Sequence, residues 1–325
     1  MSAVADNSSR LSGTQGSAKP ISLACAPCCW GVDDVSNPHL PSWTKVLDEA
    51  AEVGFTGLEL GPYGYMPLED QALSSALRDR NLFIVAGTIF DDLVSQENVE
   101  NLLRQTDEIC VFIAALPAPP DHAGQRYPAP YLTVMDWGHE ERDFAAGKSE
   151  QAPRLDDNAW AGMMFNIRAI SERARDVYGI RATVHPHAGG YIEFADEIER
   201  LTADINPEIA GLCLDTGHLA YSGMDPLESL RLYADRIDYL HFKDIDPVVF
   251  DQVMGETIRF FDACAKGVMC PIGRGKIDYP AIRALLNELG YRGYITIEQE
   301  RDPLNSVSVK SDLASSRSYL SETGY

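Results

Sequence analysis

The sequence lacks any long uninterrupted run of apolar residues. No stretch approaches the about 18 to 20 apolar residues that a membrane-spanning helix needs. The chain also does not start with the basic and apolar segments of a secretory leader. We therefore expect a soluble, cytoplasmic protein with no membrane partner. The seven cysteines, an odd number, agree with free thiols in a reducing compartment.

The chain is also poor in basic residues. It has 27 lysines and arginines against 49 aspartates and glutamates, which gives a formal net charge of −22. A field of this sign repels nucleic-acid phosphates, so it argues against a nucleic-acid partner and against DNA repair. A complete nucleotide-binding loop is missing as well. No G-x-G-x-x-G follows the first predicted strand, and Gly273-Arg274-Gly275-Lys276 does not belong to a full G-x-x-x-x-G-K-[ST] motif.

What the sequence contains is a regular alternation of short β-rich apolar runs with longer amphipathic segments. Residues 1–19 are rich in Ser, Gly and Ala and predict a flexible tail, which leaves one catalytic domain at residues 20–325. The predicted strands are residues 21–28, 57–60, 82–88, 110–116, 182–187, 210–216, 237–243 and 294–300. Eight strands separated by helical segments favour an α/β fold, a closed (β/α)8 TIM barrel, over an open sheet.

Two segments are longer than a bare barrel requires. Residues 117–156 form a Pro- and Gly-rich insertion after the fourth predicted strand. Connections that follow barrel strands lie on the catalytic face, so this one is either a lid or substrate wall or a subunit contact. Residues 247–278, after the seventh predicted strand, predict an extra helix with an apolar side. That side either packs on the core or forms the contact of a homo-oligomer.

Each of the last four predicted strands ends with a side chain that can bind a metal. The ends read ATVHPH, GLCLDTGH, YLHFKD and ITIEQE, and they supply His185, Asp215, His241 and Glu298. The carboxyl ends of barrel strands meet at one mouth. Two imidazoles and two carboxylates are a mixed ligand set for Mn²⁺, Co²⁺, Zn²⁺, Mg²⁺ or Fe²⁺. A single histidine on a strand is more often a hydrogen-bonded core residue, but buried carboxylates are costly without a cation.

Several motifs resemble a known family. The stretches GLCLDTGHLAYSGMDP, IDYLHFKDI, GRGKIDY and GYRGYITIEQERDP are similar to the xylose-isomerase-like TIM-barrel superfamily of sugar isomerases, epimerases and inosose dehydratases. The resemblance covers residues 20–305 and is strongest from residue 180 onward. Within the superfamily, the H-x-K-D stretch, the E-x-E-x-D-P ending and the His-rich fifth strand are most similar to the inosose dehydratases.

The resemblance implies a metal held by Glu, Asp, His and Glu at the ends of strands five to eight. Carried over, these positions are His185, Asp215, His241 and Glu298. The fifth strand departs from the family, because its usual E-x-H is replaced here by His185-Pro186-His187. An imidazole in place of a carboxylate removes one negative charge, which leaves the identity of the metal open. His187 is an alternative ligand or a substrate contact.

The resemblance implies a metal-dependent lyase that removes the α-proton of a keto-cyclitol or keto-sugar and eliminates a β-hydroxyl. The alternatives are a keto-sugar isomerase or epimerase, a 3-oxo-glycoside (C-glycoside) deglycosidase with a possible partner subunit in a hetero-oligomer, and a non-enzymatic binding barrel. The predicted proton carriers are Glu59, His218, Lys243 and Glu300. The predicted substrate contacts are His187, Arg274 and Trp30.

Two of these side chains have a structural alternative. Glu59 fits a salt link as well as catalysis, and Lys243 could orient Asp244 or bind a substrate oxygen. Trp30 follows Cys25-x-x-Cys28-Cys29, a run that we assign to packing or to lining the mouth, because no second cysteine pair completes a zinc site.

Overall fold

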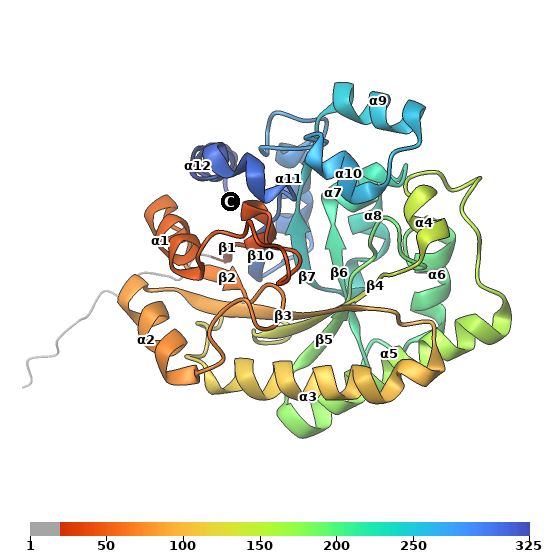
Figure 1. The fold of residues 1–325 in the computed structure, drawn as a ribbon, viewed down its shortest axis with the longest axis horizontal. Coiled ribbons are helices and arrows are strands. Elements are labelled where there is room, and N and C mark those ends of the chain that lie inside the picture. Colours follow the sequence, from red (N-terminus) through yellow and green to blue (C-terminus); the bar gives the residue numbers. More distant parts are fainter. Residues whose placement is uncertain (1–19) are drawn as a thin grey trace, which may run out of the picture.

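Eight parallel strands close into a barrel in the part of the chain that the computed structural model describes, residues 20–325 (Figure 1). Around the barrel they follow the order β1-β10-β7-β6-β5-β4-β3-β2. Their bounds are β1 (Ile21–Cys25), β2 (Gly57–Glu59), β3 (Phe83–Asp91), β4 (Tyr131–Asp136), β5 (Arg181–Val184), β6 (Gly211–Asp215), β7 (Ile237–Phe242) and β10 (Gly293–Ile297). The predicted TIM barrel is confirmed, and the predicted tail at residues 1–19 lies outside the described residues.

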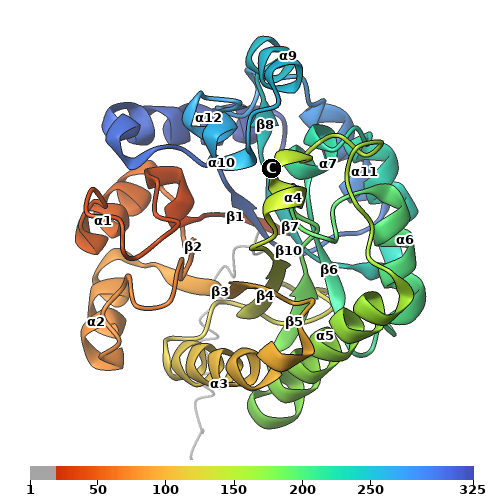
Figure 2. The same cartoon turned by 45° about the vertical axis from the view of Figure 1, so that its right-hand side comes forward.

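Helices surround the barrel and cover its outer face (Figure 2). They are α1 (Trp43–Val53), α2 (Asp70–Arg80), α3 (Val99–Ala115), α4 (Glu140–Phe144), α5 (Asp157–Tyr178), α6 (Ala195–Asp204), α7 (Thr216–Tyr221), α8 (Pro226–Leu232), α9 (Pro247–Glu256), α10 (Phe260–Ala265), α11 (Tyr279–Glu288) and α12 (Val309–Glu322), with short 3-10 turns η1 (Pro27–Trp30), η2 (Gln96–Asn98), η3 (Ala234–Arg236) and η4 (Pro303–Ser308). Their ends follow capping rules. At α5, for example, the Asp156 side chain accepts from the Ala159 amide, and Gly179 ends the helix at a φ of 67°.

The fourth strand is not where the sequence predicted it. The apolar run at residues 110–116 belongs almost entirely to α3, and the strand is β4, whose sequence is YLTVMD. Residues 117–156 are therefore not an insertion after strand four. Residues 117–130 lead into β4 at the amino-terminal end of the barrel, where His122 Nε2 lies 2.8 Å from the Ser22 hydroxyl of β1. Only residues 137–156, which include α4, follow β4 on the catalytic face.

A layer of tyrosines fills the barrel interior below the carboxyl ends of the strands. Tyr131, Tyr239 and Tyr294 are buried there together with small residues of neighbouring strands. The rings of Tyr131 and Tyr239 stack with centroids 4.8 Å apart. Ring packing of this kind fills the interior of the barrel. The space left for a ligand therefore lies at the carboxyl ends of the strands.

The segment after β7 contains two helices, α9 and α10, where the sequence predicted one. It also carries a short antiparallel pair, β8 (Asp244–Ile245) with β9 (Met269–Cys270). Phe260 of α10 is fully buried and packs on His187 at 5.1 Å between ring centroids, whereas Val248 of α9 is 77% exposed. The apolar side of α10 thus packs on the core. Within residues 20–325, no helix is long and apolar enough to cross a membrane.

Candidate metal centre and pocket

The structure brings the four predicted metal ligands together. His185 directly follows β5, Asp215 ends β6, His241 lies in β7, and Glu298 directly follows β10. One ligand atom from each residue lies within 4.8 Å of the corresponding atoms of the other three. All four side chains are buried or nearly so. Parallel strands of one barrel end at the same face, so four separate sequence positions meet at one point.

The two imidazoles present free nitrogens to this point. His185 Nδ1 lies 2.8 Å from the Pro186 carbonyl, which must accept its proton and leaves the Nε2 lone pair free. His241 Nε2 lies 2.8 Å from Glu59 Oε1, which leaves Nδ1 free. Neither nitrogen makes a well-aligned hydrogen bond. They lie 4.0 and 3.9 Å from Asp215 Oδ2, and His241 Nδ1 also lies 3.0 Å from Glu298 Oε2. Two buried imidazole nitrogens beside carboxylates fit a divalent ion held by mixed N/O ligands.

The protonation of His241 is linked to this centre. Burial by itself would lower the pKa of His241, but Cys213, Glu298 and Glu59 raise it well above its usual range. The raised pKa therefore favours a second proton on the ring, at Nδ1, which lies 3.0 Å from Glu298 Oε2. A metal ligand must give up that proton, so we expect metal binding to release a proton.

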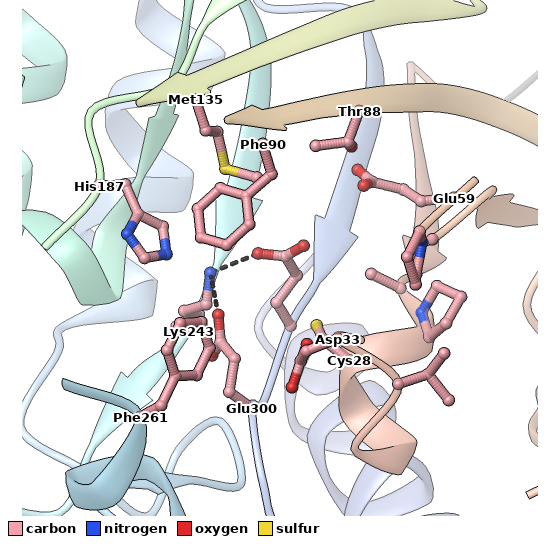
Figure 3. A pocket seen from close by; sticks show the side chains of 16 residues that line it. Cys28, Asp33, Glu59, Thr88, Phe90, Met135, His187, Lys243, Phe261 and Glu300 are labelled. Atoms are coloured by element: carbon pink, nitrogen blue, oxygen red, sulfur yellow. Dashed lines mark hydrogen bonds and ion pairs between the residues drawn. The ribbon is translucent and has the colours of Figure 1, made fainter. Parts of the chain in front are cut away.

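Lys243 places an ammonium group beside the same carboxylates. Its Nζ lies 2.8 Å from Asp215 Oδ2. It also lies 3.0 Å from Glu300 Oε1 and contacts Glu298 (Figure 3). Burial would lower the pKa of Lys243, but these three carboxylates raise it well above its usual range. The lysine is therefore charged and acts as an internal counter-ion. The three carboxylates therefore have a positively charged partner within the protein itself.

The structure corrects one alternative for Lys243. We expected that it could orient Asp244, but the Asp244 carboxylate accepts hydrogen bonds from the backbone amides of Gly273, Gly275 and Ile277. Asp244 therefore fixes the loop before α11, on which the G-R-G-K stretch lies. The side chain of Lys243 instead points toward the strand ends.

A second cluster contains His187, His218 and Glu300. The Ala188 amide donates to His218 Nδ1 at 3.2 Å, so the proton of the neutral ring sits on Nε2, which lies 3.9 Å from Glu300 Oε1. Burial, together with neighbouring positive charge, holds the pKa of both histidines well below the usual range. A protonated Nε2 is a donor and not a ligand, so this cluster suits hydrogen bonding to a substrate better than a second ion.

His187, Lys243, Glu298 and Glu300 border a pocket of about 630 Å³, a volume that includes its opening to solvent (Figure 3). It is lined by Ala26, Pro27, Cys28, Val32, Asp33, Glu59, Gly61, Pro62, Thr88, Phe90, Met135, His187, Lys243, Phe261, Glu298 and Glu300. The apolar wall comes from β3, β4 and α10. The polar wall comes from the carboxyl ends of β5, β7 and β10. Such a mixture suits a small polyol with one less polar face.

The structure does not bring Trp30 or Arg274 to this pocket. Trp30 is fully buried and its indole donates to Glu49 at 2.6 Å. Arg274 is exposed on the loop before α11, and its nearest side-chain partner is Ser315 at 3.3 Å. Of the Cys25-x-x-Cys28-Cys29 run, Cys28 lies in η1 and lines the pocket, which agrees with the assignment to packing and mouth lining.

Sequence reasoning missed Asp33 and Thr88, which also line the pocket. Thr88 lies in β3, and the pattern of the strand alone does not show which face it occupies. Asp33 lies in the connection after the first strand, on the face where catalytic residues gather in barrels. Its position in that connection was the feature of the sequence that could have identified Asp33 as a pocket residue.

Comparison with known proteins identifies close similarity over most of the chain. A family model described as xylose isomerase-like TIM barrel matches residues 47–320. An inosose dehydratase of Geobacillus kaustophilus (strain HTA426) is 29% identical over 291 residues, which cover 87% of this chain and 89% of that protein. The rhizopine catabolism protein MocC of Rhizobium meliloti is 28% identical, with 87% and 82% covered.

A solved structure, that of the IOLI protein with a binding zinc atom, superposes with a TM-score of 0.69. It covers 93% of this chain and 97% of its own, at 12% identity. At that identity the likeness shows the fold alone.

Proposed function

Because the chain belongs to the xylose isomerase-like TIM barrel family, we propose that it is a divalent-metal-dependent carbon–oxygen lyase that removes water from a small keto-cyclitol or keto-sugar. The observation that carries the proposal is the pair of buried nitrogens, His185 Nε2 and His241 Nδ1, which lie beside the carboxylates of Asp215 and Glu298. The relatives named inosose dehydratase support a dehydration. The seven free cysteines support a reducing, cytoplasmic compartment.

The ion would be held by His185, Asp215, His241 and Glu298. When bound, Mn²⁺, Co²⁺, Zn²⁺ or Mg²⁺ at this position supplies Lewis acidity that makes the α-proton of a neighbouring ketone easier to remove. The IOLI structure, which shares the fold, holds a zinc atom. Glu59 then serves as a positioning residue, because it holds the ring of His241.

We assign Glu300 as the base that takes the α-proton. Burial raises the pKa of Glu300, Lys243 lowers it, and Glu298 raises it again, with a net value of about 7. A carboxylate with a pKa near the working pH is an effective base. Lys243 holds Glu300 in the pocket at 3.0 Å and supplies positive charge beside the reacting oxygen atoms.

His187 is assigned to substrate binding and His218 to its support. The side chain of His187 lines the pocket, and its ring centroid lies 4.1 Å from that of His218. His218 is fixed in turn by the Ala188 amide. Both histidines are held neutral by burial, so they bind hydroxyl groups without carrying charge into the site.

The test is metal content and product analysis on the same preparations. We expect near-stoichiometric metal in wild type and loss of metal in Asp215→Ala. With 2-keto-myo-inositol in D₂O, NMR should show α-deuterium exchange and a dehydrated product, and Glu300→Gln should lose both while keeping its metal. Exchange or epimer formation without dehydration would move the assignment to an isomerase or epimerase. Aglycone release from a 3-keto-glucoside would move it to a deglycosidase, and negligible metal in both proteins would contradict the centre.

A further inference from the structure

Asp33 is the carboxyl group in the pocket that the proposed function leaves without a task. It lies in the connection after β1 and lines the same pocket as Lys243 and Glu300 (Figure 3). In the view of Figure 3, the Lys243–Glu300 pair lies between His187 and Asp33. Within residues 20–325, the Asp33 side chain makes no hydrogen bond or ion pair, whereas Glu298 and Glu300 both contact Lys243.

The surroundings of Asp33 favour its neutral form. Burial is the main cause that raises its pKa well above the usual range, and the charges of Glu300 and Glu298 add to it, while Lys243 acts in the opposite direction. The adjoining pocket wall includes Val32 and the thiol of Cys28, neither of which is a strong hydrogen-bond partner. In this neutral form the carboxyl has an O–H with no acceptor among the described residues, so a molecule in the pocket can accept it.

The other ionisable groups of the pocket wall are weak acids or are bonded to protein partners. His187 is neutral because burial lowers its pKa, and Cys28 is a poor acid because its pKa is raised by its hydrogen bond to Cys29 and by burial. Lys243 donates to three carboxylates. Glu59 accepts from His241 and Tyr239. Of the carboxyl groups that line the pocket in the described part of the chain, Asp33 alone has a pKa raised well above the usual range and no hydrogen bond or ion pair to the protein.

Elimination of a hydroxyl needs a proton donor as well as a base, because hydroxide is a poor leaving group at neutral pH. We propose that Asp33 is the general acid that protonates the departing β-hydroxyl, an inference that rests on the proposed lyase function. The Asp33 O–H bond breaks and a new O–H bond forms on the leaving oxygen. The C–O bond breaks toward that oxygen, which departs as water, while the electrons of the α C–H bond form the C=C bond. Glu300 keeps the α-proton, and exchange with solvent restores both carboxyl groups.

The experiment compares Asp33→Asn with Asp34→Asn in the metal-loaded protein. Asparagine keeps the size of the side chain at position 33 but cannot donate an acidic proton. Asp34 is exposed and bonds only to Ser36 in the same loop, so its variant controls for changes in loop conformation. Two substrates are used, 2-keto-myo-inositol and its analogue with fluorine in place of the β-hydroxyl. Fluoride leaves without protonation, so its loss does not need a general acid.

We expect Asp33→Asn to lose water from the hydroxyl substrate at least about 100-fold more slowly than wild type. Its α-deuterium exchange and its fluoride release should stay within a few fold of wild type, and Asp34→Asn should match wild type in all three assays. Dehydration by Asp33→Asn at the wild-type rate would overturn the inference. An equal decrease in the rates of water loss and of fluoride release would also overturn it, since the residue would then only position the substrate. Absence of α-exchange in wild type itself would contradict the proposed lyase and, with it, this assignment.

Discussion

The residue that accepts a hydrogen bond from one nitrogen of a histidine decides which nitrogen remains free to bind an ion. Glu59 Oε1 accepts from His241 Nε2 at 2.8 Å and from the Tyr239 hydroxyl at 2.7 Å. A carboxylate in this position fixes the ring and makes the free nitrogen more basic. Glu59 thus affects the metal centre without being a ligand, although the sequence suggested it equally as a salt link and as a proton carrier.

We expect Glu59→Gln to weaken metal binding by about 10- to 100-fold. The amide fills the same space, but it lacks the negative charge that supports the His241 ring. Competition with a coloured chelator for Zn²⁺ or Mn²⁺ measures the affinity. Tyr239→Phe is the matched control, because it removes the other partner of Glu59 and keeps the bond to His241. Unchanged affinity in Glu59→Gln would show that the carboxylate has no such role.

At the scale of elements, α4 is tied to the barrel by a histidine at its start. His139, the residue before α4, lies with Nε2 3.1 Å from Asp136 Oδ1 at the end of β4. Burial by itself would lower the pKa of His139, but the hydrogen bond and the charges of Asp136, Asp92 and Glu141 outweigh it. The pKa is therefore raised above 6.5. The folded protein binds this proton more tightly than the unfolded chain does.

The pH dependence of stability follows from that difference. The contribution of His139 is fully present below about pH 6.5, the value of the unfolded chain, and is lost as the pH rises through the higher folded pKa. His139→Gln keeps a hydrogen-bond donor but cannot be charged. We expect urea unfolding to give a higher free energy of unfolding for wild type than for the variant below about pH 6.5. This difference should shrink as the pH rises through the folded pKa of His139. A difference that is constant with pH would contradict the link.

Helix α7 approaches Lys243 closely enough to require a glycine. A Cβ added at Gly217 would lie 2.4 Å from Lys243 Cβ, closer than packed side chains allow. We expect Gly217→Ala to displace the lysine, to lower turnover and to destabilise the fold by about 1–3 kcal/mol. Gly255→Ala in α9 is the control, because its Cβ would meet no atom within 4 Å and should be neutral or slightly stabilising. Thermal unfolding and activity of both variants test this.

The fourth strand shows where the sequence was insufficient. A short apolar run such as residues 110–116 suits both a buried strand and a buried helix face. In the structure Ile109, Phe112 and Ile113 are buried while Val111 is 57% exposed, which is the pattern of a helix. The true strand, YLTVMD, was hidden among prolines and glycines. The barrel was still predictable, because the other seven strands carried clear patterns.

The candidate site was predictable for side chains on strand ends but not for those on loops. His185, Asp215, His241 and Glu298 converge because the barrel determines where strands end. The side chains of Trp30 and Arg274 turn away because of partners that the sequence does not show, Glu49 and Ser315. Asp33 was missed for the same reason, since loop conformation decides whether a side chain enters the pocket.

For the whole molecule, the barrel combines a filled amino-terminal end with a charged carboxyl-terminal end. The tyrosine layer occupies the first, and three carboxylates with one ammonium group occupy the second. Lys243 offsets one of the three negative charges, and the raised pKa of His241 favours a second positive charge that a divalent ion would replace. The ion-free protein therefore has enough compensation to fold, and the charge that remains favours binding of a divalent cation.

Removal of the metal should accordingly lower stability without unfolding the protein. An ion present at 100 times its Kd adds about 2.7 kcal/mol, which for a chain of this size raises Tm by about 5 °C. The pKa of His241 is raised and its proton must leave, so the increase in Tm should grow with pH. Scanning fluorimetry of chelator-treated protein with and without added Zn²⁺ or Mn²⁺ measures it. Asp215→Ala should show no increase, and a chelator-treated wild type that is already unfolded would show that Lys243 does not compensate the site.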